Sequence, residues 1–482
     1  MIASEVRVRI APSPSGYLHV GTARMAIANY LFARHSGGKF LVRIEDTDVE
    51  RSDQSMVAPI VDALGWLGIE SDEPIVYQSQ RKTLHAECIR PILESGRGYR
   101  CFCSPEQLAK DREEAKAAKG PMQYNRRCLS LSKDEVDARV TAGEKFAVRI
   151  RIPDGVTRFT DMVSGNLTRA NEEIEDFVIA RSDGTATYNL AVVVDDHDMN
   201  ITHVIRGNDH ITNTFKQVLI YDALGYDLPQ FGHVPLILRP DKRKVSKRLG
   251  DKDVAQYRQE GIIPEAMFNY LCLLGWSSKT DEEIFSVNKL IEIFDPNNFS
   301  RSNAIFDEEK LVALNHQHLM KKSDHELATL VAPILVDAGL TTKYWLETRW
   351  DYLRQIVAML RERAKRTTEY AQMSGYYFSA DFAYEEKAEA KQFTPEAADR
   401  LDRLAERFEA LGAFSHDDIE AALSGLAEEM EVGKGKLIHP TRLAVSGVSK
   451  GPGLYDMLAV LTQPVVIERM KKASEYIRKK NA

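Results

Sequence analysis

The sequence predicts an α/β fold built on an open parallel sheet, followed by an all-helical last third. Residues 6–44 read as a strand, a loop, an apolar helix and a second strand, which is the basic unit of a parallel sheet. Beyond about residue 325, every segment with a regular apolar pattern has helical spacing. These segments are 327–338, 350–369, 397–411, 419–429 and 454–461.

The composition excludes several classes of protein. The chain has 482 residues, of which 44% are hydrophobic, and a formal net charge of −7. We expect roughly two to four domains, and any contact with RNA must come from local basic patches. The N-terminus carries charges where a leader needs an apolar run, and no apolar run reaches membrane length. Five scattered cysteines do not suit a disulfide framework, so we expect a soluble cytoplasmic protein.

The segment 9–24, RIAPSPSGYLHVGTAR, joins the first strand to the first helix. The unpaired N–H groups and the dipole of a helix N-terminus favour an anion, and Gly16 and Gly21 allow close approach to the backbone. His19 lies at the junction, where an imidazole can donate a hydrogen bond to a phosphate oxygen. The same residues are common in ordinary turns, so both interpretations stay open at this point.

Acidic residues at 45–48 follow the second strand, which we place at 40–44. Ligands of open parallel sheets bind beyond the carboxyl ends of the strands. These acids could hold an ammonium group or ribose hydroxyls, or simply form an Asp-rich turn. The next apolar segment, 57–67, predicts a helix that packs on the core.

Two later segments repeat the plan of a buried run followed by polar residues. The run 191–194 suits either a buried parallel strand or a helix, and it ends in Asp-Asp-His at 195–197. The strand ending at 204–205 precedes Arg-Gly-Asn-Asp-His at 206–210. We expect these polar residues to share one site.

Three cysteines lie within a short stretch of the chain: Cys101, Cys103 and Cys128. With a fourth donor they would satisfy tetrahedral zinc. Cys-x-Cys is tighter than the usual Cys-x2-Cys, so three reduced structural cysteines are the competing interpretation.

The segment 242–248, KRKVSKR, holds five cations in seven residues, as a solvated surface or a nucleic-acid patch would. Together with HVGTAR at 19–24, it resembles the two signatures, called HIGH and KMSKS, of the class I aminoacyl-tRNA synthetases. The forms RIAPSP at 9–14 and KVSKR at 244–248 resemble those of the bacterial glutamyl-tRNA synthetases. The resemblance covers nearly the whole chain.

This resemblance implies a Rossmann-like, doubly wound parallel catalytic domain with an α+β insertion, followed by all-α C-terminal anticodon-binding domains. The catalytic domain would comprise 1–79 and 188–250, and the insertion at 80–187 would bind the acceptor end of tRNA. A stem-contact region would follow at 251–324, before the helical anticodon-binding region at 325–482. Glutaminyl and archaeal-type relatives end in β-barrels instead.

The resemblance also assigns site residues. The positions that match the family's glutamate site are Arg9, Ala11, Ser13, Glu45, Tyr188, Arg206 and His210. Those that match its ATP site are His19, Gly21, Thr22, Arg24, Asp209, Lys244, Ser246 and Lys247. The catalytic positions are His19, Lys244, Lys247 and Arg248.

Chemistry supports these roles, since planar guanidinium groups bind carboxylates bidentately and a carboxylate such as Glu45 suits the α-amino group. Val192 and Asn208 depart from the family pattern. They stand where some members place an asparagine and an acidic residue.

Some members of the family bind zinc through Cys-x-Cys followed by Tyr-x3-Cys, and this chain reproduces that pattern. Ser130 stands where other members offer a histidine. The resemblance therefore leaves Tyr124 as the candidate fourth ligand, beside Cys101, Cys103 and Cys128.

In the family, the region around 361–366 meets the anticodon, and Arg363 aligns best with a base-reading arginine. We expect these cations to form a ridge late in the helix 350–369. A solvated helix face with intrahelical ion pairs to Glu362 and Glu369 is the alternative.

The activity implied is that of a glutamate–tRNA ligase using L-glutamate, ATP and Mg²⁺. Glutamate would attack the α-phosphate of ATP, giving glutamyl-adenylate and pyrophosphate, and the terminal adenosine of tRNA-Glu would then take the glutamyl group from the adenylate. Members of the family form the adenylate only with tRNA bound. We expect a monomer that has no membrane partner.

Four alternatives stay in view. Within the family, the enzyme could also charge tRNA-Gln. A tRNA-modifying paralogue would lack the helical C-terminal region, and an unrelated adenylyltransferase would not explain it. A non-catalytic tRNA-binding homologue has no need of His19, Lys244 and Lys247.

Overall fold

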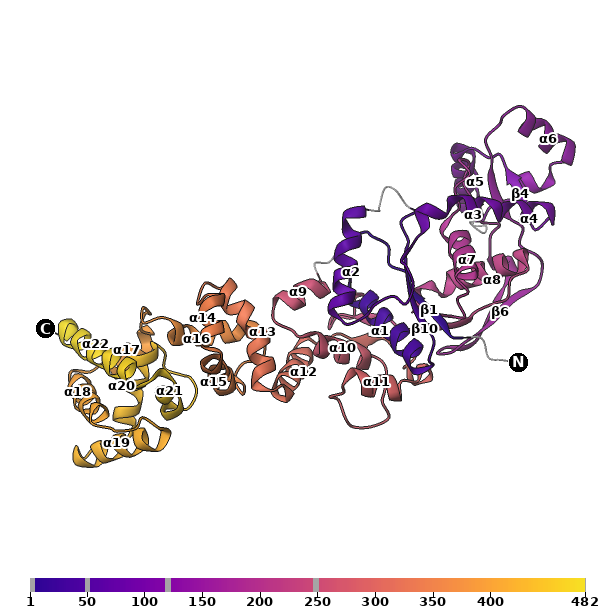
Figure 1. Ribbon diagram of the computed structural model, residues 1–482. Coiled ribbons are helices and arrows are strands. Elements are labelled where there is room, and N and C mark those ends of the chain that lie inside the picture. Colours follow the sequence, from indigo (N-terminus) through magenta and orange to yellow (C-terminus); the bar gives the residue numbers. More distant parts are fainter. Residues whose placement is uncertain (1–4, 48–52, 118–122, 246–250, 482) are drawn as a thin grey trace. The chain divides into compact units, whose positions relative to one another are not determined.

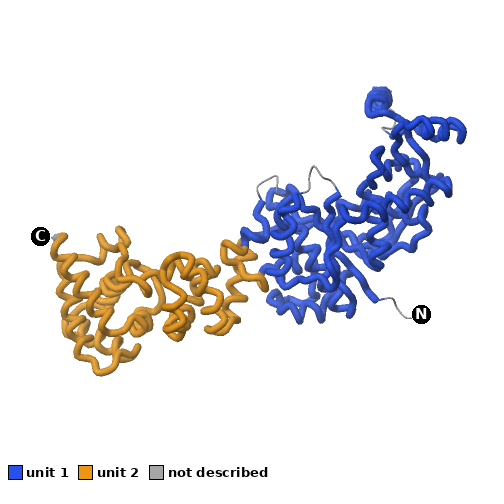
Figure 2. Tube along the Cα trace, turned by 45° about the horizontal axis from the view of Figure 1, so that its top comes forward, with its two compact units in different colours: residues 1–257, 267–308 blue, residues 258–266, 309–482 orange. Residues whose placement is uncertain are grey.

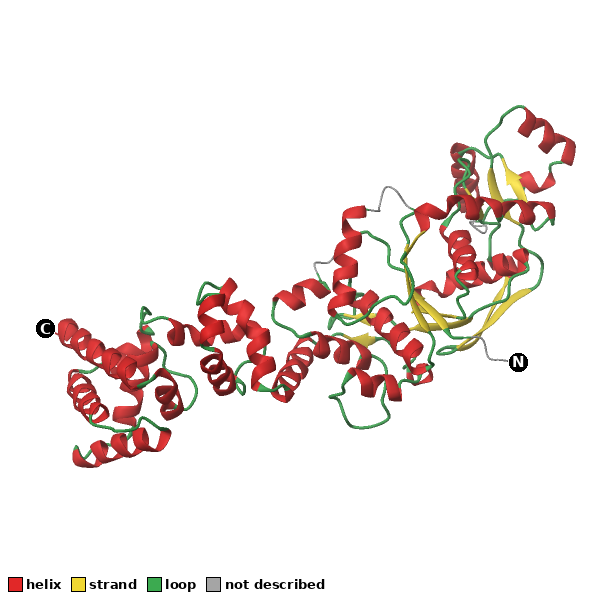
Figure 3. Ribbon diagram, viewed as in Figure 1, coloured by secondary structure: helices red, strands yellow, loops and turns green. Residues whose placement is uncertain are grey.

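A computed structural model describes residues 5–47, 53–117, 123–245 and 251–481. The chain divides into two compact units (Figure 2). Unit 1 comprises residues 1–257 and 267–308, and unit 2 comprises residues 258–266 and 309–482. Among the described residues, strands occur in unit 1 alone (Figure 3).

Two sheets form the centre of unit 1. The first has the order β3-β2-β1 and is parallel, with β1 at Arg7–Ile10, β2 at Lys39–Ile44 and β3 at Val76–Tyr77. The second has the order β7-β6-β10-β9, with β6 at Val156–Asp161, β7 at Gly165–Ala170, β9 at His203–Gly207 and β10 at Gln230–Val234. Strands β6, β10 and β9 are parallel, and β7 runs antiparallel to β6.

The two sheets meet between β1 and β9. The N–H of Arg7 donates to Oγ1 of Thr202 over 2.8 Å, and the N–H of Thr202 donates to the carbonyl of Arg7 over 2.9 Å. On one side of this seam the chain continues from β1 to β2 and β3, and on the other side β9 is followed by β10, β6 and β7. The seam is therefore a topological switch point. Such points open a crevice beyond the carboxyl ends of the strands, where ligands bind.

Helices surround these sheets (Figure 1). In chain order they are α1 (Val20–His35), α2 (Val57–Trp66), α3 (Lys82–Glu87), α4 (Ile89–Glu94), α7 (Tyr188–Asp198), α8 (Ile211–Leu224) and α11 (Val287–Ile293). The sequence prediction of a strand, a loop and a helix at the N-terminus is confirmed by β1 and α1. The run 191–194, which allowed a strand or a helix, lies inside α7 and is buried on all sides.

A three-stranded antiparallel sheet of order β4-β5-β8 forms the centre of the insertion, with α5 and α6 gathered near β4 (Figure 1). Its elements are β4 (Gly98–Cys101), α5 (Pro105–Ala117), α6 (Lys133–Thr141), β5 (Ala147–Ile150) and β8 (Val178–Ala180). The hairpin β6–β7 falls within the predicted insertion range, yet it extends the second central sheet by pairing with β10.

Unit 2 is helical. Its elements after residue 309 are the rest of α12 (Glu308–Lys321), then α13 (Asp324–Asp337), α14 (Lys343–Thr348), α15 (Trp350–Leu360), α16 (Thr367–Phe378), α17 (Glu386–Gln392), α18 (Pro395–Glu409), α19 (His416–Glu429), α20 (Gly435–Ser446), α21 (Leu454–Leu461) and α22 (Gln463–Asn481). Four of these helices had no counterpart in the sequence prediction: α14, α17, α20 and α22.

Helices α9 (Val254–Gln259) and α10 (Pro264–Leu273) are separate, because Gly261 adopts φ +92° and Pro264 starts the second helix. One predicted helix is wrong in extent. The segment 350–369 is interrupted at 361–366. There the N–H of Thr367 donates to the carbonyl of Gly261 over 3.0 Å, so a tertiary contact replaces the intrahelical bond.

Small parallel strands β11 (Ile237–Leu238) and β12 (Ala304–Ile305) complete unit 1. Among the described residues, no helix combines the length and the apolar character needed to cross a membrane.

Candidate active site

A cleft of about 830 Å³ opens at the switch point between β1 and β9. Every described residue that the sequence assigned to glutamate or ATP lines it: Arg9, Ala11, Ser13, His19, Gly21, Thr22, Arg24, Glu45, Tyr188, Arg206, Asp209, His210 and Lys244. Three further assigned residues, Ser246, Lys247 and Arg248, lie outside the described residues.

His19 is the N-cap of α1. Its Nδ1 accepts a hydrogen bond from the N–H of Gly21 over 3.0 Å, so the neutral ring carries its proton on Nε2. A Cβ at position 21 would lie 3.2 Å from that Nδ1, which explains why glycine suits this position. The cap therefore leaves His19 as a hydrogen-bond donor beside the first turn of α1.

Arg24, which was assigned to the ATP site, is almost completely buried. The residue is 2% exposed, and its Nη1 donates to the carbonyl of Pro235 over 2.7 Å. Burial lowers the pKa of Arg24 to about 10. Arg24 therefore lines the cleft while its hydrogen bond to Pro235 holds it next to the end of β10.

Lys244 and Asp209 form an ion pair, with Nζ 2.6 Å from Oδ2. Burial raises the pKa of Asp209, but the hydrogen bond and the charge of Lys244, together with His210 beside it, outweigh that effect, and the net pKa lies below the ordinary value. Both side chains are more than a third exposed, so the pair is accessible from the cleft.

Arg9 is held by an acid that sequence reasoning did not assign. Its Nε and Nη2 donate to the two carboxylate oxygens of Asp196 over 2.9 and 3.2 Å. Arg43, on β2, donates to the same carboxylate over 2.5 Å and to Glu45 over 3.2 Å. Burial would raise the pKa of Asp196, yet Arg43 and Arg9 lower it to about 2, so this acid is ionised. Nη1 of Arg9 has no hydrogen-bond partner among the described residues.

Glu45 and Tyr188 stand near these arginines. Burial raises the pKa of Glu45, and Arg43 and Arg9 oppose that effect. The hydroxyl of Tyr188 lies 3.2 Å from Nδ1 of His210, and burial raises the pKa of Tyr188 to about 12. Burial and Arg206 lower the pKa of His210 to about 4, so its ring is neutral at pH 7.

Arg206, at the end of β9, is held by neutral groups. Nη2 donates to Oγ1 of Thr214 and to Oε1 of Gln217, each over 2.6 Å, and Nε donates to Nε2 of His233 over 3.3 Å. Burial lowers the pKa of Arg206. Unlike Arg9, it has no carboxylate among its hydrogen-bond partners within the described residues.

Four residues around the cleft were not assigned from the sequence: Arg43, Asp161, Asp196 and His233. Asp196 was expected among the polar residues of the shared site after a run that allowed a strand or a helix, and it lies on α7, which turns it inward. Asp161 and His233 lie on β6 and β10, far apart in sequence, and no local pattern joins them. Asp46, by contrast, is structural, since its carboxylate accepts from the N–H and the hydroxyl of Ser79.

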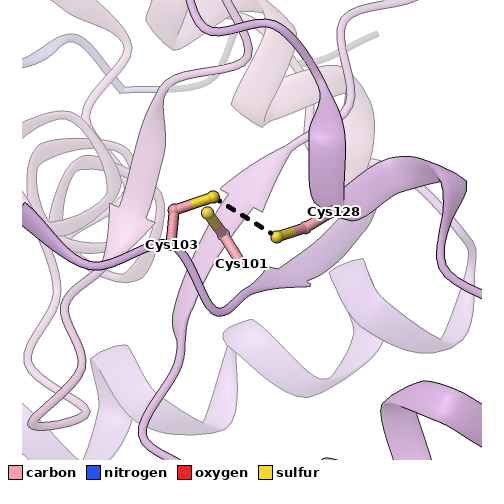
Figure 4. A group of neighbouring side chains, drawn as sticks. All are labelled: Cys101, Cys103 and Cys128. Atoms are coloured by element: carbon pink, nitrogen blue, oxygen red, sulfur yellow. Dashed lines mark hydrogen bonds between the residues drawn. The ribbon is translucent and has the colours of Figure 1, made fainter. Parts of the chain in front are cut away.

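The three predicted cysteines of the insertion converge, and their side chains point toward one another (Figure 4). Their sulfurs lie within 4.8 Å of one another, and those of Cys103 and Cys128 are 3.5 Å apart. The hydroxyl of Tyr124 lies 3.5 Å from the sulfurs of Cys101 and Cys103. The hydroxyl of Ser130 donates instead to the carbonyl of Arg127.

A second cavity, of about 650 Å³, lies within unit 2 and contains Arg363. Arg363 is exposed on the turn between α15 and α16, so the predicted ridge late in one helix is wrong. Its neighbours Arg361 and Arg366 pair with Asp324 and Glu260, rather than along one helix. Arg442, on α20, lines the same cavity and donates to the carbonyl of Pro452 over 2.8 Å.

Comparisons with known proteins identify the family of the chain. A family model described as "tRNA synthetases class I (E and Q), catalytic domain" matches residues 5–313, and one described as "Anticodon binding domain" matches residues 326–474. The chain is 41% identical to glutamate–tRNA ligase 2 of Thermoanaerobacter pseudethanolicus, with 99% of each chain covered. It is 43% identical to the glutamate–tRNA ligase of Nitratidesulfovibrio vulgaris, covering 98% of this chain and 99% of that one.

Among solved structures, the chain is similar to a glutamate tRNA ligase from Elizabethkingia meningosepticum in complex with its amino acid. The TM-score is 0.90 at 32% identity, and the match covers 98% of this chain and 100% of the other. Because the catalytic-domain model matches more than half of the chain and the relatives align along nearly all of it, the chain belongs to the class I tRNA synthetases of the E and Q group.

Proposed function

We propose that this chain is a glutamate–tRNA ligase, which activates L-glutamate with ATP and transfers it to the terminal adenosine of tRNA-Glu. The observation that carries the proposal is the pair Arg9 and Arg206 in one cleft. Each guanidinium is buried and fixed by two or more hydrogen bonds, and Nη1 of each has no partner among the described residues. Two fixed cationic donors suit a substrate with two carboxylates.

The remaining glutamate contacts follow from the same cleft. Glu45 would accept from the α-amino group, since it is the carboxylate beside Arg9 and Arg43. Tyr188, with its phenol protonated at pH 7, would donate a hydrogen bond to the side chain of the substrate glutamate or accept one from it. Ser13 and Ala11 would line the entrance of the cleft. Val192 is buried within α7, so it offers the substrate no polar contact.

ATP would lie toward the N-terminus of α1. The Nε2–H of His19 and the first-turn backbone at Gly21 and Thr22 would meet phosphate oxygens, where a helix N-terminus favours negative charge. When ATP binds, Lys244 would leave its ion pair with Asp209 and contact a phosphate oxygen instead. Lys247 and Arg248 would contact the phosphates as well, and Mg²⁺ would enter with ATP. The substrate carboxylate is the nucleophile, so the protein's contribution is positioning and stabilisation of charge on the α-phosphate.

The cysteine cluster fits a structural zinc ion. Sulfurs placed about 2.3 Å from a tetrahedral zinc lie about 3.8 Å from one another, close to the spacing of these three thiols. Tyr124 would be the fourth ligand. Metal analysis of the purified protein should give one zinc per chain, and Cys128→Ser should abolish it while Cys88→Ser should not.

The cavity of unit 2 would receive the anticodon. Arg363 and Arg442 place two guanidinium groups around it, and Nη1 of Arg442 is buried without an acceptor among the described residues, so a base edge would satisfy it. The helical region 325–482 would thus bind the anticodon, and the insertion at 80–187 the acceptor end. We expect the monomer to be the active form.

The test is aminoacylation with labelled glutamate and ATP, with purified tRNA-Glu and tRNA-Gln assayed separately. We expect tRNA-Glu to be charged. Charging of both tRNAs would keep the ligase activity and identify a non-discriminating enzyme. Charging of neither, with the protein folded, would contradict the proposal and favour a non-catalytic tRNA-binding homologue.

A further inference from the structure

A buried chain of hydrogen bonds leads away from the cleft behind Arg206. Nε of Arg206 lies 3.3 Å from Nε2 of His233, and Nδ1 of His233 lies 2.6 Å from Oδ2 of Asp161. His233 and Asp161 are 1% and 2% exposed. Neither residue lines the cleft, so both can act on a substrate only through Arg206.

The protonation of His233 follows from its neighbours. Nε2 of His233 faces Nε–H of Arg206 at 3.3 Å and Oγ1 of Thr214 at 2.8 Å. A guanidinium can only donate, and the Thr214 hydroxyl, which accepts from Nη2 of Arg206, can donate its own proton to Nε2, so both groups are satisfied when Nε2 accepts. The ring is therefore neutral, with its proton on Nδ1, and that N–H donates to Asp161. A proton on Nε2 would turn toward Oγ1 of Thr214, and Nε–H of Arg206 would then lose its acceptor.

Asp161 is itself fixed by the hairpin that ends β6. Its Oδ1 accepts from the N–H groups of Val163 and Ser164 over 3.0 and 2.8 Å, and its Oδ2 accepts from the N–H of His233 over 3.0 Å. These bonds direct the carboxylate at the imidazole. A group with this many donors around it is ionised, and it selects the His233 tautomer that can accept from Arg206.

We propose that Asp161 and His233 are positioning residues that fix Arg206 for a substrate carboxylate without neutralising it. This proposal rests on the glutamate–tRNA ligase function proposed above. A carboxylate in direct contact, like Asp196 beside Arg9, would compete with the substrate for the guanidinium. An imidazole placed between the acid and Arg206 supplies orientation but leaves the positive charge of Arg206 to the ligand.

A matched pair of substitutions at His233 separates this role from simple packing. In His233→Gln, the side-chain oxygen takes the place of Nε2 and can accept from Arg206. In His233→Asn, the amide takes the place of Nδ1, keeps the bond to Asp161 and loses the acceptor. We expect His233→Asn to raise the KM for glutamate at least tenfold, with the KM for ATP changed less than twofold, and His233→Gln to restore most of the loss.

Asp161→Asn provides a second test with a spectroscopic readout. One amide oxygen must serve the N–H groups of Val163 and Ser164, which leaves the NH₂ facing Nδ1 of His233. The ring should then move its proton to Nε2, and the ¹⁵N shifts of His233 should exchange between the two nitrogens relative to the wild type. The KM for glutamate should rise together with this change.

Kinetics are measured by ATP–pyrophosphate exchange with tRNA-Glu present, and each variant is first checked for a wild-type thermal melt. Variants of His233 and Asp161 that are folded, retain the wild-type KM for glutamate and retain the ¹⁵N pattern would overturn the positioning role. An equal rise in the KM values of glutamate and ATP would also overturn it. If the wild type itself does not charge tRNA-Glu, the proposed function fails, which is a distinct result.

Discussion

The cavities of the two units both contain arginines, but they hold them differently. In unit 1, Arg9 and Arg206 are buried and fixed by side-chain hydrogen bonds. In unit 2, Arg363 is exposed on a turn between two helices, and Arg442 is anchored through the carbonyl of Pro452. One cavity fixes its charges before a ligand arrives, and the other presents one charge that a ligand can order.

This difference suits ligands of different size. Glutamate differs from glutamine by one charged group, and a small ligand can be selected by that group only if the complementary charge is already fixed and desolvated. A tRNA contacts its protein at many points, so a single exposed arginine can be ordered on binding. Removing a buried charge should therefore cost more than removing an exposed one.

The largest effect is expected from Arg206→Gln. Replacing a buried charge that meets a carboxylate costs about 3–5 kcal/mol, so kcat/KM for glutamate should fall roughly 150- to 5,000-fold, as ATP–pyrophosphate exchange would measure. Arg90→Gln, on the surface, is the control and should leave it unchanged. A decrease in kcat/KM of less than tenfold would contradict the claim that the cavity of unit 1 depends on a fixed, buried charge more than the cavity of unit 2 does.

A smaller effect is expected from Lys247→Ala. The family resemblance places this lysine where charge develops on the phosphates, and loss of one such group costs about 10²-fold in the rate of activation. Single-turnover adenylate formation in the presence of tRNA measures it, with Lys289→Ala, an exposed lysine paired with Glu292, as the control. An unchanged single-turnover rate would remove Lys247 from the mechanism.

Arg363→Ala should act on tRNA rather than on glutamate. Loss of one base-edge contact costs about 1–3 kcal/mol, so the KM for tRNA-Glu should rise about tenfold, with the KM for glutamate unchanged. Arg354→Ala removes an exposed arginine of α15 that pairs with Asp351, and it should change neither value. Equal KM values for tRNA-Glu in the wild type and Arg363→Ala would place the anticodon elsewhere.

The smallest effect concerns pH and His210. Its folded-state pKa, about 4, lies below the usual value near 6.5, so the unfolded chain binds a proton before the folded one does. Its contribution to the free energy of unfolding is thus complete above pH 6.5 and is lost as pH falls toward 4. Between pH 7.5 and 6, His210 should account for a decrease of about 1 kcal/mol.

Urea unfolding of the wild type and His210→Asn across this pH range measures that contribution. The asparagine keeps an acceptor near Nδ1 and cannot titrate, so its profile should be flatter. Parallel profiles would show that His210 titrates normally in the folded protein.

Much of the cleft could be predicted from local sequence, because β1, its loop and the N-terminus of α1 are contiguous. The α-amino partner Glu45 follows directly from the strand before it. The groups that hold the arginines could not be predicted. The run before Asp196 allowed a strand or a helix, so the sequence did not define which way this acid points, and Asp161 and His233 come together through strand pairing between β6 and β10.

The helical region shows the same limit. Apolar spacing predicted α13, α18, α19 and α21 closely, since each buries one face. It could not predict the interruption at 361–366, where the carbonyl of Lys365 accepts from Asn315 and the N–H of Thr367 donates to Gly261. These tertiary contacts, and no glycine or proline, end α15 and place Arg363 on a turn.

The most direct test of this account is calorimetric titration of the wild-type protein with L-glutamate and with L-glutamine, under identical conditions and with tRNA-Glu present. We expect glutamate to bind at least 100-fold more tightly, because glutamine brings one carboxylate to the two fixed guanidinium groups and leaves one buried charge without a counter-charge. Arg206→Gln should reduce that preference to within a few fold. Equal affinities for the two amino acids in the wild type would contradict the claim that a fixed, un-neutralised Arg206 selects the substrate.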